Sequence, residues 1–300
     1  MSRRVFNTGA TGFAGRHLVD ACGDAGDVVV AAPPSSEADL RNAAVARALV
    51  ARARPDVVFH LAARAHVGQS WEDPLGTFAD NVALSAGVLE AVRREAPDAV
   101  VVHVGSSEEY GPPPGAEPMT EAMLPRPQNP YAVSKASSTL VATFYADAYG
   151  LCVHRVRAFN HAGPGQEPIY ALANFASQTA AGLAAGEDPV RIVTGSPDAR
   201  RDYTDVRDVV RAYRLLADHD QPGLFNVCSG ISRSARELLA ALSETAGVEI
   251  LHEVDPARVR ANEVPDVRGS AERLHAATGW QPRIPFEQTL ADTLAWWRAR

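Results

Sequence analysis

The sequence predicts an α/β protein in which a doubly wound parallel sheet carries a smaller C-terminal α/β lobe. Apolar runs that predict buried strands alternate with helical periodicities over residues 1–163. A glycine-rich turn separates the first strand from the first helix, which is typical of sheets that bind dinucleotides. The 300 residues, 46% of them hydrophobic, are enough for two lobes with a large buried core.

The first lobe is predicted as a Rossmann-type unit, because strands that alternate with helices form a parallel sheet with helices on both faces. The predicted strands are Arg4–Thr8, Val28–Ala32, Val57–Leu61, Ala99–Val104 and Leu151–Arg157. The predicted helices begin near Gly12 and at Pro130, and cover residues 41–54 and 76–95.

The alternation loosens near residue 164, where a second lobe is predicted to begin. Its predicted elements are helices at 171–185, 234–247 and 286–298, a strand at Glu249–Val254 and a loop at Arg200–Tyr203. A helix at 205–218 and a strand at Leu224–Cys228 are expected to return to the first lobe. The predicted dinucleotide-binding domain is therefore 1–163 with about 205–230, and the second lobe is 164–204 with 231–300.

The segment Gly9–Gly15 follows the first strand and precedes the first helix. In that context backbone N–H groups and the helix dipole hold a pyrophosphate, and glycine lets the phosphates approach closely. The G-x-x-G-x-x-G spacing differs from the G-x-G-x-x-G fingerprint, so a purely structural turn is the alternative. The residues predicted to bind the cofactor here are Gly9, Thr11, Gly12, Phe13, Ala14, Gly15 and Arg16.

The end of the second strand favours NADP(H) over NAD(H). An acidic residue there binds the ribose 2′-hydroxyl in NAD sites, but the stretch Ala31–Ser36 carries no carboxylate. Arg16 and Arg41 are the nearest cations. Asp39 is predicted beside the adenine, with a plain helix cap as the alternative. The full set predicted to line this part of the cofactor site is Asp39, Leu40, Leu61, Ala62 and Ala63.

Tyr131 and Lys135 lie one turn apart on the helix that begins at Pro130, so their side chains share a face. An ammonium near a phenol favours the phenolate. We therefore expect Lys135 to lower the pKa of Tyr131, so that the tyrosine moves a proton near neutral pH. Taken alone, the spacing is also that of an ordinary surface pair.

The stretch Gly105–Gly111 follows the fourth strand, and ligands of parallel sheets bind at the carboxyl ends of strands. Ser106 is predicted to hydrogen-bond a substrate carbonyl and orient it toward Tyr131, unless the stretch is only a serine-rich turn. Glu108 is predicted as an acid/base group or as a solvated side chain. The proline-rich segment 111–130 is predicted to lie over the site.

The bulk properties exclude several partners. The formal net charge is −7 and the arginines are spread along the chain, so no nucleic-acid partner is expected. Cys22, Cys152 and Cys228 are odd in number and lack metal-ligand spacing, which argues against a disulfide framework and a metal site. No apolar run reaches membrane-spanning length and the N-terminus shows no signal peptide, so a cytoplasmic protein without a membrane partner is expected.

Together these motifs resemble the extended short-chain dehydrogenases/reductases that act on nucleotide sugars, and the resemblance covers essentially all 300 residues. It implies that Gly9–Gly15 binds the pyrophosphate and that His60–Ala63 lies beside the cofactor. It also implies that Ser106 orients a ketone, that Tyr131 donates a proton, and that Lys135 lowers the pKa of Tyr131 and binds the nicotinamide ribose.

A narrower resemblance is to the GDP-4-dehydro-6-deoxy-D-mannose reductases. It rests on the stretches Gly105–Gly111, Arg157–Gln166, Arg201–Asp208 and Val259–Pro265. It implies that Asn160 and Arg201 hold the diphosphate, that Arg260 and Glu263 hold the nucleoside, and that Ser107 contacts the substrate.

Two residues depart from the pattern of these reductases. Asn7 lies inside the first strand, where an apolar residue is usual, and Ala261 stands where proline is usual. The second departure weakens the assignment of the nucleoside site.

The resemblance implies NADPH-dependent reduction of the C4 ketone of a nucleotide-linked 4-keto-6-deoxyhexose, namely GDP-4-keto-6-deoxy-D-mannose to GDP-D-rhamnose. A GDP-mannose 4,6-dehydratase, with Glu108 removing the C5 proton, and a reductase of a dTDP-linked sugar are alternatives. An epimerase and a non-catalytic NADP-sensing protein are more distant ones. The family also implies a homodimer formed through the helices at 78–95 and 131–149.

Overall fold

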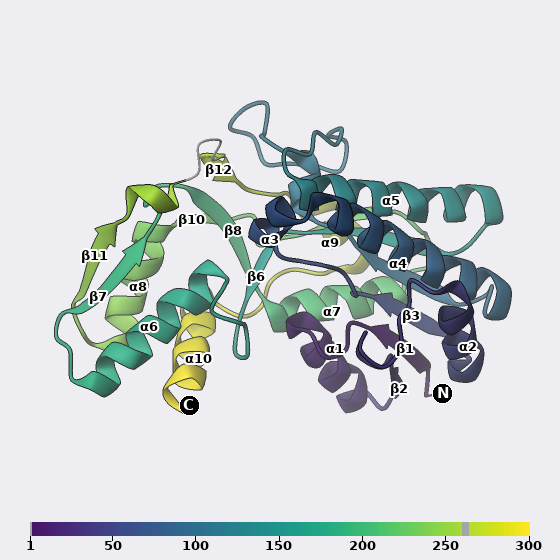
Figure 1. The fold of residues 1–300 in the computed structure, drawn as a ribbon, viewed down its shortest axis with the longest axis horizontal. Coiled ribbons are helices and arrows are strands. Elements are labelled where there is room, and N and C mark those ends of the chain that lie inside the picture. The colour runs from purple at the N-terminus through teal and green to yellow at the C-terminus, as the bar shows by residue number, and fades with distance from the viewer. Residues whose placement is uncertain (1, 260–263) are drawn as a thin grey trace.

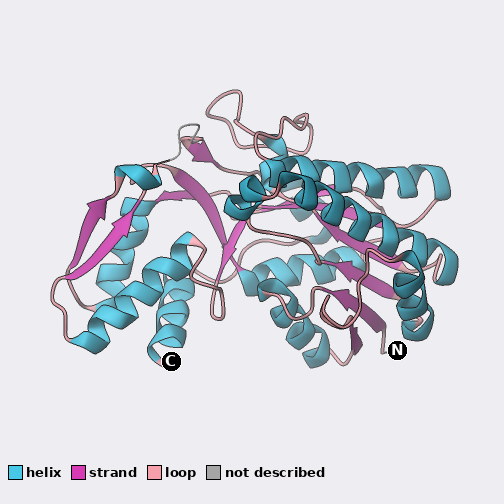
Figure 2. Cartoon of the chain, viewed as in Figure 1, coloured by secondary structure: helices cyan, strands magenta, loops and turns pink. Residues whose placement is uncertain are grey.

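The computed structural model describes residues 2–259 and 264–300, which form two lobes that lie side by side (Figure 1). The larger lobe contains the N-terminus and a six-stranded sheet. The smaller lobe contains the C-terminal helix α10 (Phe286–Arg298). Figure 2 shows helices on both sides of the large sheet, which confirms the predicted α/β class.

The large sheet is entirely parallel and follows the order β2-β1-β3-β4-β5-β9. Its strands are β1 (Arg4–Thr8), β2 (Val28–Ala31), β3 (Val57–His60), β4 (Val100–Val104), β5 (Val153–Ala158) and β9 (Leu224–Val227). All six were predicted, with small shifts at their ends. The strand order reverses between β1 and β3, and open sheets of this kind bind ligands at the carboxyl ends of strands at such a point.

Alternate residues of each strand face opposite sides of the sheet, so each side needs its own helical cover. Val5 and Val57 belong to one hydrophobic core, whereas their neighbours Phe6 and Val58 belong to the other. The first core is covered by α1 (Phe13–Asp24), α7 (Val206–Ala217) and α9 (Glu272–Thr278), and the second by α2 (Ala43–Ala53), α4 (Pro74–Glu95) and α5 (Pro130–Tyr149).

The smaller lobe has a separate core, to which Leu172, Ile192, Leu239 and Leu290 contribute. Its helices are α6 (Ala171–Ala185), α8 (Ala235–Ala246) and α10. Its strands are β6 (Asn160–Ala162), β7 (Val190–Thr194), β8 (Arg200–Asp205), β10 (Ser232–Ser234), β11 (Ile250–Val254) and β12 (Asp266–Val267). The remaining elements of the described chain are α3 (Val67–Glu72) and the short 3₁₀ turns η1 (Ser107–Tyr110) and η2 (Pro256–Arg258).

The predicted loop at Arg200–Tyr203 is wrong, because these residues belong to strand β8. β8 pairs antiparallel with β10 and parallel with β6 and β12. The run Arg-Arg-Asp-Tyr has no apolar alternation, so its strand conformation depends on partners that are distant in sequence. Helix α3 was not predicted either.

The C-terminal region also differs from the prediction, which assigned all of 231–300 to the second lobe. Leu274 of α9 and the fully buried Trp280 lie in the first core, on the face of the large sheet that α1 and α7 cover. Among the described residues, no helix is both long and apolar enough to cross a membrane. The same residues contain no group of three or more His, Cys, Asp or Glu side chains arranged to hold a metal ion.

Candidate active site

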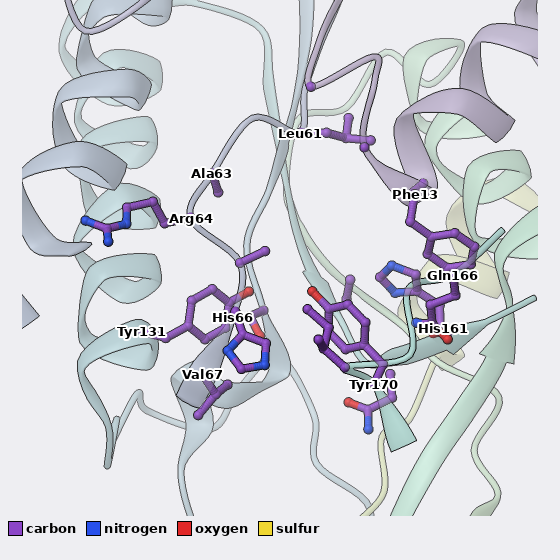
Figure 3. Close-up of a pocket in the computed structure, with 18 of the residues that line it drawn as sticks. Phe13, Leu61, Ala63, Arg64, His66, Val67, Tyr131, His161, Gln166 and Tyr170 are labelled. Atoms are coloured by element: carbon purple, nitrogen blue, oxygen red, sulfur yellow. Dashed lines mark hydrogen bonds between the residues drawn. The ribbon is translucent and has the colours of Figure 1, made fainter. Parts of the chain in front are cut away.

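A cavity of about 960 Å³ lies between the two lobes, at the carboxyl ends of β1, β3 and β4. The larger lobe contributes Gly9–Gly15, Ser106 and the first turn of α5 to its wall, and the smaller lobe contributes Tyr170 and Arg201. Figure 3 shows part of this wall, with Tyr131 and Phe13 on opposite sides. Strand ends that are far apart in the sequence thus meet in one site.

The glycine turn packs tightly against the backbone of the protein itself. Gly9 has a φ of +79°, and a Cβ there would lie 2.8 Å from the Ala62 backbone nitrogen. A Cβ on Gly15 would lie 2.0 Å from the Gly9 carbonyl oxygen. Buried Asn7 donates from Nδ2 to the Gly15 carbonyl oxygen at 3.2 Å, so this unusual polar residue of β1 ties the strand to the first turn of α1.

Asp39, Leu40 and Arg41 line the cavity near the end of β2. The Arg41 guanidinium donates to both carboxylate oxygens of Asp39, at 2.9 and 3.1 Å from Nε, and also to Asp80. These bonds hold the pKa of Asp39 below its usual value. This end of the cavity therefore presents a guanidinium whose charge is shared between two carboxylates.

The cavity floor holds Ser106, Tyr131 and Lys135. The backbone N–H of Tyr131 donates to Ser70 Oγ of α3 at 3.1 Å, which fixes the start of α5. The Ser106 side chain lies close enough to the Tyr131 phenol to influence its pKa, and the buried Lys135 ammonium donates to the Val104 carbonyl. The three predicted catalytic side chains therefore lie together on the floor of the cavity.

The prediction that the Tyr131 pKa is lowered is wrong for this arrangement. Burial raises the pKa of Tyr131 above its usual value, the nearby Ser106 hydroxyl partly opposes this rise, and the Glu108 carboxylate adds to it. Burial also lowers the pKa of Lys135 to about 8, with Glu109 acting in the opposite direction. The desolvation of both groups outweighs the effect expected from their spacing alone.

Glu108 and Glu109 are adjacent but lie in different environments. Glu108 lines the cavity, and its Oε2 accepts a hydrogen bond from Asn129 Nδ2 at 2.8 Å. Glu109 is fully buried and accepts from the Ser106 backbone N–H at 2.9 Å, from Thr139 Oγ1 at 3.0 Å and from Arg157 Nε at 2.9 Å. Glu109 was not predicted, yet it holds the backbone of Ser106 in place.

Most of the predicted cofactor residues line this cavity, but Arg16 does not. Its guanidinium donates to the Gly165 carbonyl at 3.0 Å. Of the predicted substrate residues, Asn160 and Arg201 line the cavity, whereas Ser107 is buried away from it. Arg260, Ala261 and Glu263 lie outside the described residues.

The proline-rich segment does not occupy the predicted place, since no residue from Gly111 to Gln128 is part of the described cavity wall. It packs instead beside Gly269, with which buried Met119 forms a β-bridge, and beside η1, where the Arg126 N–H donates to the Glu109 carbonyl.

Two further side chains of the cavity wall, His66 and Tyr170, were missed. His66 follows the end of β3, so its place after a buried strand was the available sequence indication. Tyr170 stands in a loop before α6, and no pattern in the sequence indicates that it turns toward the cavity.

Comparison with known proteins agrees with this geometry. Residues 35–293 match the protein family described as GDP-mannose 4,6 dehydratase. The chain belongs to this family. The chain is therefore an extended short-chain dehydrogenase/reductase, and it is an NAD(P)-dependent enzyme of the oxidoreductase type.

The chain is 35% identical to the GDP-6-deoxy-D-mannose reductase of Pseudomonas aeruginosa, over 100% of this chain and 99% of the relative. It is 30% identical to a UDP-glucose 4-epimerase of Mycolicibacterium smegmatis, over 98% of each chain. The solved structure of RMD from Pseudomonas aeruginosa complexed with NADPH superposes with a TM-score of 0.91 at 34% identity, covering 99% of both chains.

The residues of the cavity fit a bound dinucleotide. The backbone of Gly9–Gly15 lines the cavity at the N-terminus of α1, where unpaired N–H groups and the helix dipole suit a pyrophosphate. Tyr213 of α7 lines the cavity with a buried hydroxyl that has no hydrogen-bond partner among the described residues. Buried hydroxyls are almost always paired, so this group is available to a ligand.

Proposed function

We propose that the protein uses NADPH to reduce the C4 ketone of a nucleotide-linked 4-keto-6-deoxyhexose, converting GDP-4-keto-6-deoxy-D-mannose to GDP-D-rhamnose. The observation that carries this proposal is that Ser106, Tyr131 and Lys135 meet in the lining of one cavity, beside the glycine turn Gly9–Gly15. The full-length similarity to a GDP-6-deoxy-D-mannose reductase supports the same reaction.

Each catalytic residue has a separate task. A bound nicotinamide cofactor supplies the hydride for the ketone carbon. Ser106 hydrogen-bonds the ketone oxygen and holds it beside Tyr131. Because its pKa is raised, Tyr131 keeps its proton until the more basic alkoxide forms, and then donates it. The Lys135 ammonium stabilises the resulting phenolate and binds the nicotinamide ribose.

The substrate diphosphate is proposed to lie against Asn160 and Arg201, both of which line the part of the cavity formed by the smaller lobe. A guanidinium matches phosphate oxygens in bidentate geometry. The nucleoside contacts proposed for Arg260 and Glu263, and the substrate contact proposed for Ser107, rest on the sequence resemblance alone.

NADPH is proposed over NADH because Arg41 lies in the cavity wall beside the residues that end β2, including Pro33 and Ser35. A 2′-phosphate there can replace part of the contact that Arg41 makes with Asp39. The NADPH complex of the Pseudomonas aeruginosa structure supports the same preference.

We also propose that the protein is a homodimer and that it is cytoplasmic. Helices α4 and α5 pack side by side, and α5 exposes Leu140, Phe144 and Tyr149 at 68, 53 and 50%. Apolar side chains gathered in this way mark an interaction site, and a second copy of the same surface would cover them. Sedimentation velocity of Leu140→Glu should show a monomer if this surface forms the dimer.

A GDP-mannose 4,6-dehydratase is the second candidate, favoured by one observation. Glu108 lines the same cavity as Tyr131 and is held there by Asn129. A carboxylate in that place is suited to removing the C5 proton of a 4-ketosugar. The family match carries the dehydratase description as well.

The deciding experiment mixes the purified protein with NADPH and enzymatically prepared GDP-4-keto-6-deoxymannose, and follows the absorbance of NADPH. Stoichiometric oxidation with formation of a GDP-6-deoxyhexose is expected, and NMR of the product gives the configuration at C4. A dTDP-linked ketosugar and GDP-mannose with NADP⁺ are run in parallel. Formation of ketosugar from GDP-mannose without net change in the cofactor would establish the dehydratase instead.

A further inference from the structure

His66 and Tyr170 meet across the cavity from opposite lobes. Their ring centroids are 6.2 Å apart and the rings are inclined at 69°, in an edge-to-face arrangement. Figure 3 shows His66 next to Tyr131 on one side of the cavity and Tyr170 on the other. The two rings therefore close the cavity beside the group that is proposed to donate the proton.

His66 is held in one orientation by the start of α3. It caps this helix, and its Nδ1 accepts a hydrogen bond from the Gln69 backbone N–H at 3.0 Å. An accepting Nδ1 carries no proton, so the neutral ring has its proton on Nε2. The ring also packs on Gly68, where a Cβ would lie 2.8 Å from its Cε1. His66 thus offers the cavity wall a fixed Nε2–H donor.

Tyr170 is held by its backbone rather than by its side chain. It is the N-cap residue of α6, yet its side chain makes no capping hydrogen bond. Its N–H donates to the Glu167 carbonyl at 3.3 Å, and its carbonyl accepts from the Asn174 N–H at 2.8 Å. The phenol can therefore turn its hydroxyl to a ligand while the rigid start of α6 fixes its position.

The hydroxyl of Tyr170 lies close enough to Tyr131 to contribute to the raised pKa of that residue. Ser106 and Tyr131 are assigned to the ketone oxygen, and Asn160 and Arg201 to the diphosphate. The hydroxyl on the carbon next to the ketone then needs hydrogen-bond partners that lie between the catalytic pair and the diphosphate residues. A hexose hydroxyl both donates and accepts a hydrogen bond. The Nε2–H of His66 can donate to its oxygen, and the phenol oxygen of Tyr170 can accept its proton.

We infer that Tyr170 and His66 bind a hexose hydroxyl next to the reacting ketone and thereby select the sugar, an inference that rests on the proposed function for the place of the ketone. A site that hydrogen-bonds a substrate hydroxyl strongly rejects sugars that lack it, because its own polar groups are then left unpaired. The nucleotide half of the substrate lies outside this contact.

The test compares GDP-mannose with GDP by calorimetric titration in saturating NADPH, which prevents oxidation of the sugar. Tyr170→Phe is expected to weaken GDP-mannose binding about fivefold, the range for one neutral hydrogen bond, and to leave GDP binding unchanged. His66→Asn keeps a residue that caps α3 and should weaken GDP-mannose binding to a similar degree. Tyr145→Phe is the matched control, since its hydroxyl contacts Glu90 at 3.2 Å, away from the cavity.

Equal losses for GDP and GDP-mannose, or no loss for GDP-mannose in Tyr170→Phe, would overturn the inference. Steady-state kinetics with the ketosugar provides a second measurement, in which KM should rise about fivefold while kcat stays within about twofold. Failure of the unmodified protein to oxidise NADPH with any ketosugar would refute the proposed function. The titration still decides the hexose contact in that case, because it requires no turnover.

Discussion

The floor of the cavity and its smaller-lobe wall hold their polar groups in different ways. On the floor, Glu109 binds the Ser106 backbone, Thr139 and Arg157, and Lys135 binds the Val104 carbonyl. On the wall, Ile169 is 51% exposed, and the Tyr170 side chain is not used to cap its helix. Buried hydrogen bonds fix the groups proposed for catalysis, whereas Tyr170, which is proposed for sugar recognition, has no capping bond from its side chain.

This difference separates two kinds of substitution. A change on the floor breaks buried interactions that the fold needs, so it should alter stability or the chemical step. A change on the wall removes one contact with the substrate and should alter binding only. Five predictions test the separate roles of these and neighbouring groups, from the largest expected effect to the smallest.

Tyr131→Phe should lower kcat by about two to four orders of magnitude, because it removes the proposed general acid. The ring remains, so the start of α5 and the Ser70 contact to the backbone N–H should persist. NADPH oxidation in the presence of the ketosugar measures the loss, and the melting temperature and NADPH affinity serve as controls. A variant with near-normal kcat would remove Tyr131 from the mechanism.

Glu109→Gln should destabilise the fold by about 3–5 kcal/mol, the usual result of removing one partner of a buried ion pair. Arg157 lies 2.9 Å from Glu109, and the two side chains are only 4% and 0% exposed, so the guanidinium would stay buried without its counter-charge. Urea unfolding at matched protein concentration measures this change.

Glu108→Gln is the matched control for the neighbouring position. Its side chain faces the cavity, so the free energy of unfolding should change by less than about 1 kcal/mol. Equal destabilisation by the two variants would contradict the contrast between floor and cavity wall. A loss of more than about a hundredfold in turnover for Glu108→Gln would favour the dehydratase reading, since general-base losses are of that size.

The rate should fall as pH rises through the Lys135 pKa of about 8. Below that pH the buried side chain is charged and stabilises the Tyr131 phenolate, and above it kcat/KM should drop about tenfold per pH unit. A profile of kcat/KM from pH 6 to 9.5 measures this step. In Lys135→Met, kcat/KM should be low and should not fall with pH in this range. If kcat/KM of the variant still fell near pH 8, another group would be responsible for the pH dependence.

The same pKa has a consequence for stability. The pKa of Lys135 is lowered from 10.5 to about 8, so between these values the unfolded chain binds one more proton than the folded one. The contribution of Lys135 to stability therefore rises with pH in this window, and below pH 8 the buried charge costs about 3 kcal/mol. Lys135→Met should be more stable than the unmodified protein at pH 7, as urea unfolding would show.

Arg41→Ala should weaken NADPH binding about tenfold while changing NADH binding little, because only NADPH carries the 2′-phosphate. Fluorescence titration with both cofactors measures the ratio. Arg47→Ala, which breaks an exposed ion pair with Glu95 away from the cavity, is the control. An equal loss for both cofactors would mean that Arg41 supports the shape of the site rather than the choice of cofactor.

Local pattern was sufficient for the parts of the site that lie within one element. Tyr131 and Lys135 share a helix face because α5 has the predicted period, and Gly9–Gly15 forms a tight turn because β1 leads directly into α1. The alternation of strands and helices was also sufficient for the parallel sheet and for its layers of helices.

Only the tertiary structure decided the environment of individual charges. Glu108 and Glu109 differ by one position, and a short 3₁₀ turn sends one to the cavity and the other into the core beside Arg157. Burial likewise raised the pKa of Tyr131, although its spacing from Lys135 had indicated the opposite direction. Desolvation depends on every neighbour in space, and neighbours in sequence do not reveal it.

The sequence by itself determined the fold class, the glycine turn and the helix that carries Tyr131 and Lys135, because periodicity and turn chemistry act over a few residues. The tertiary structure decided that Arg200–Tyr203 is a strand, that the Glu109 carboxylate lies buried beside Arg157, and that His66 and Tyr170 meet across the cavity. Each of these depends on contacts between segments distant in the chain, and the last forms only when the two lobes pack together.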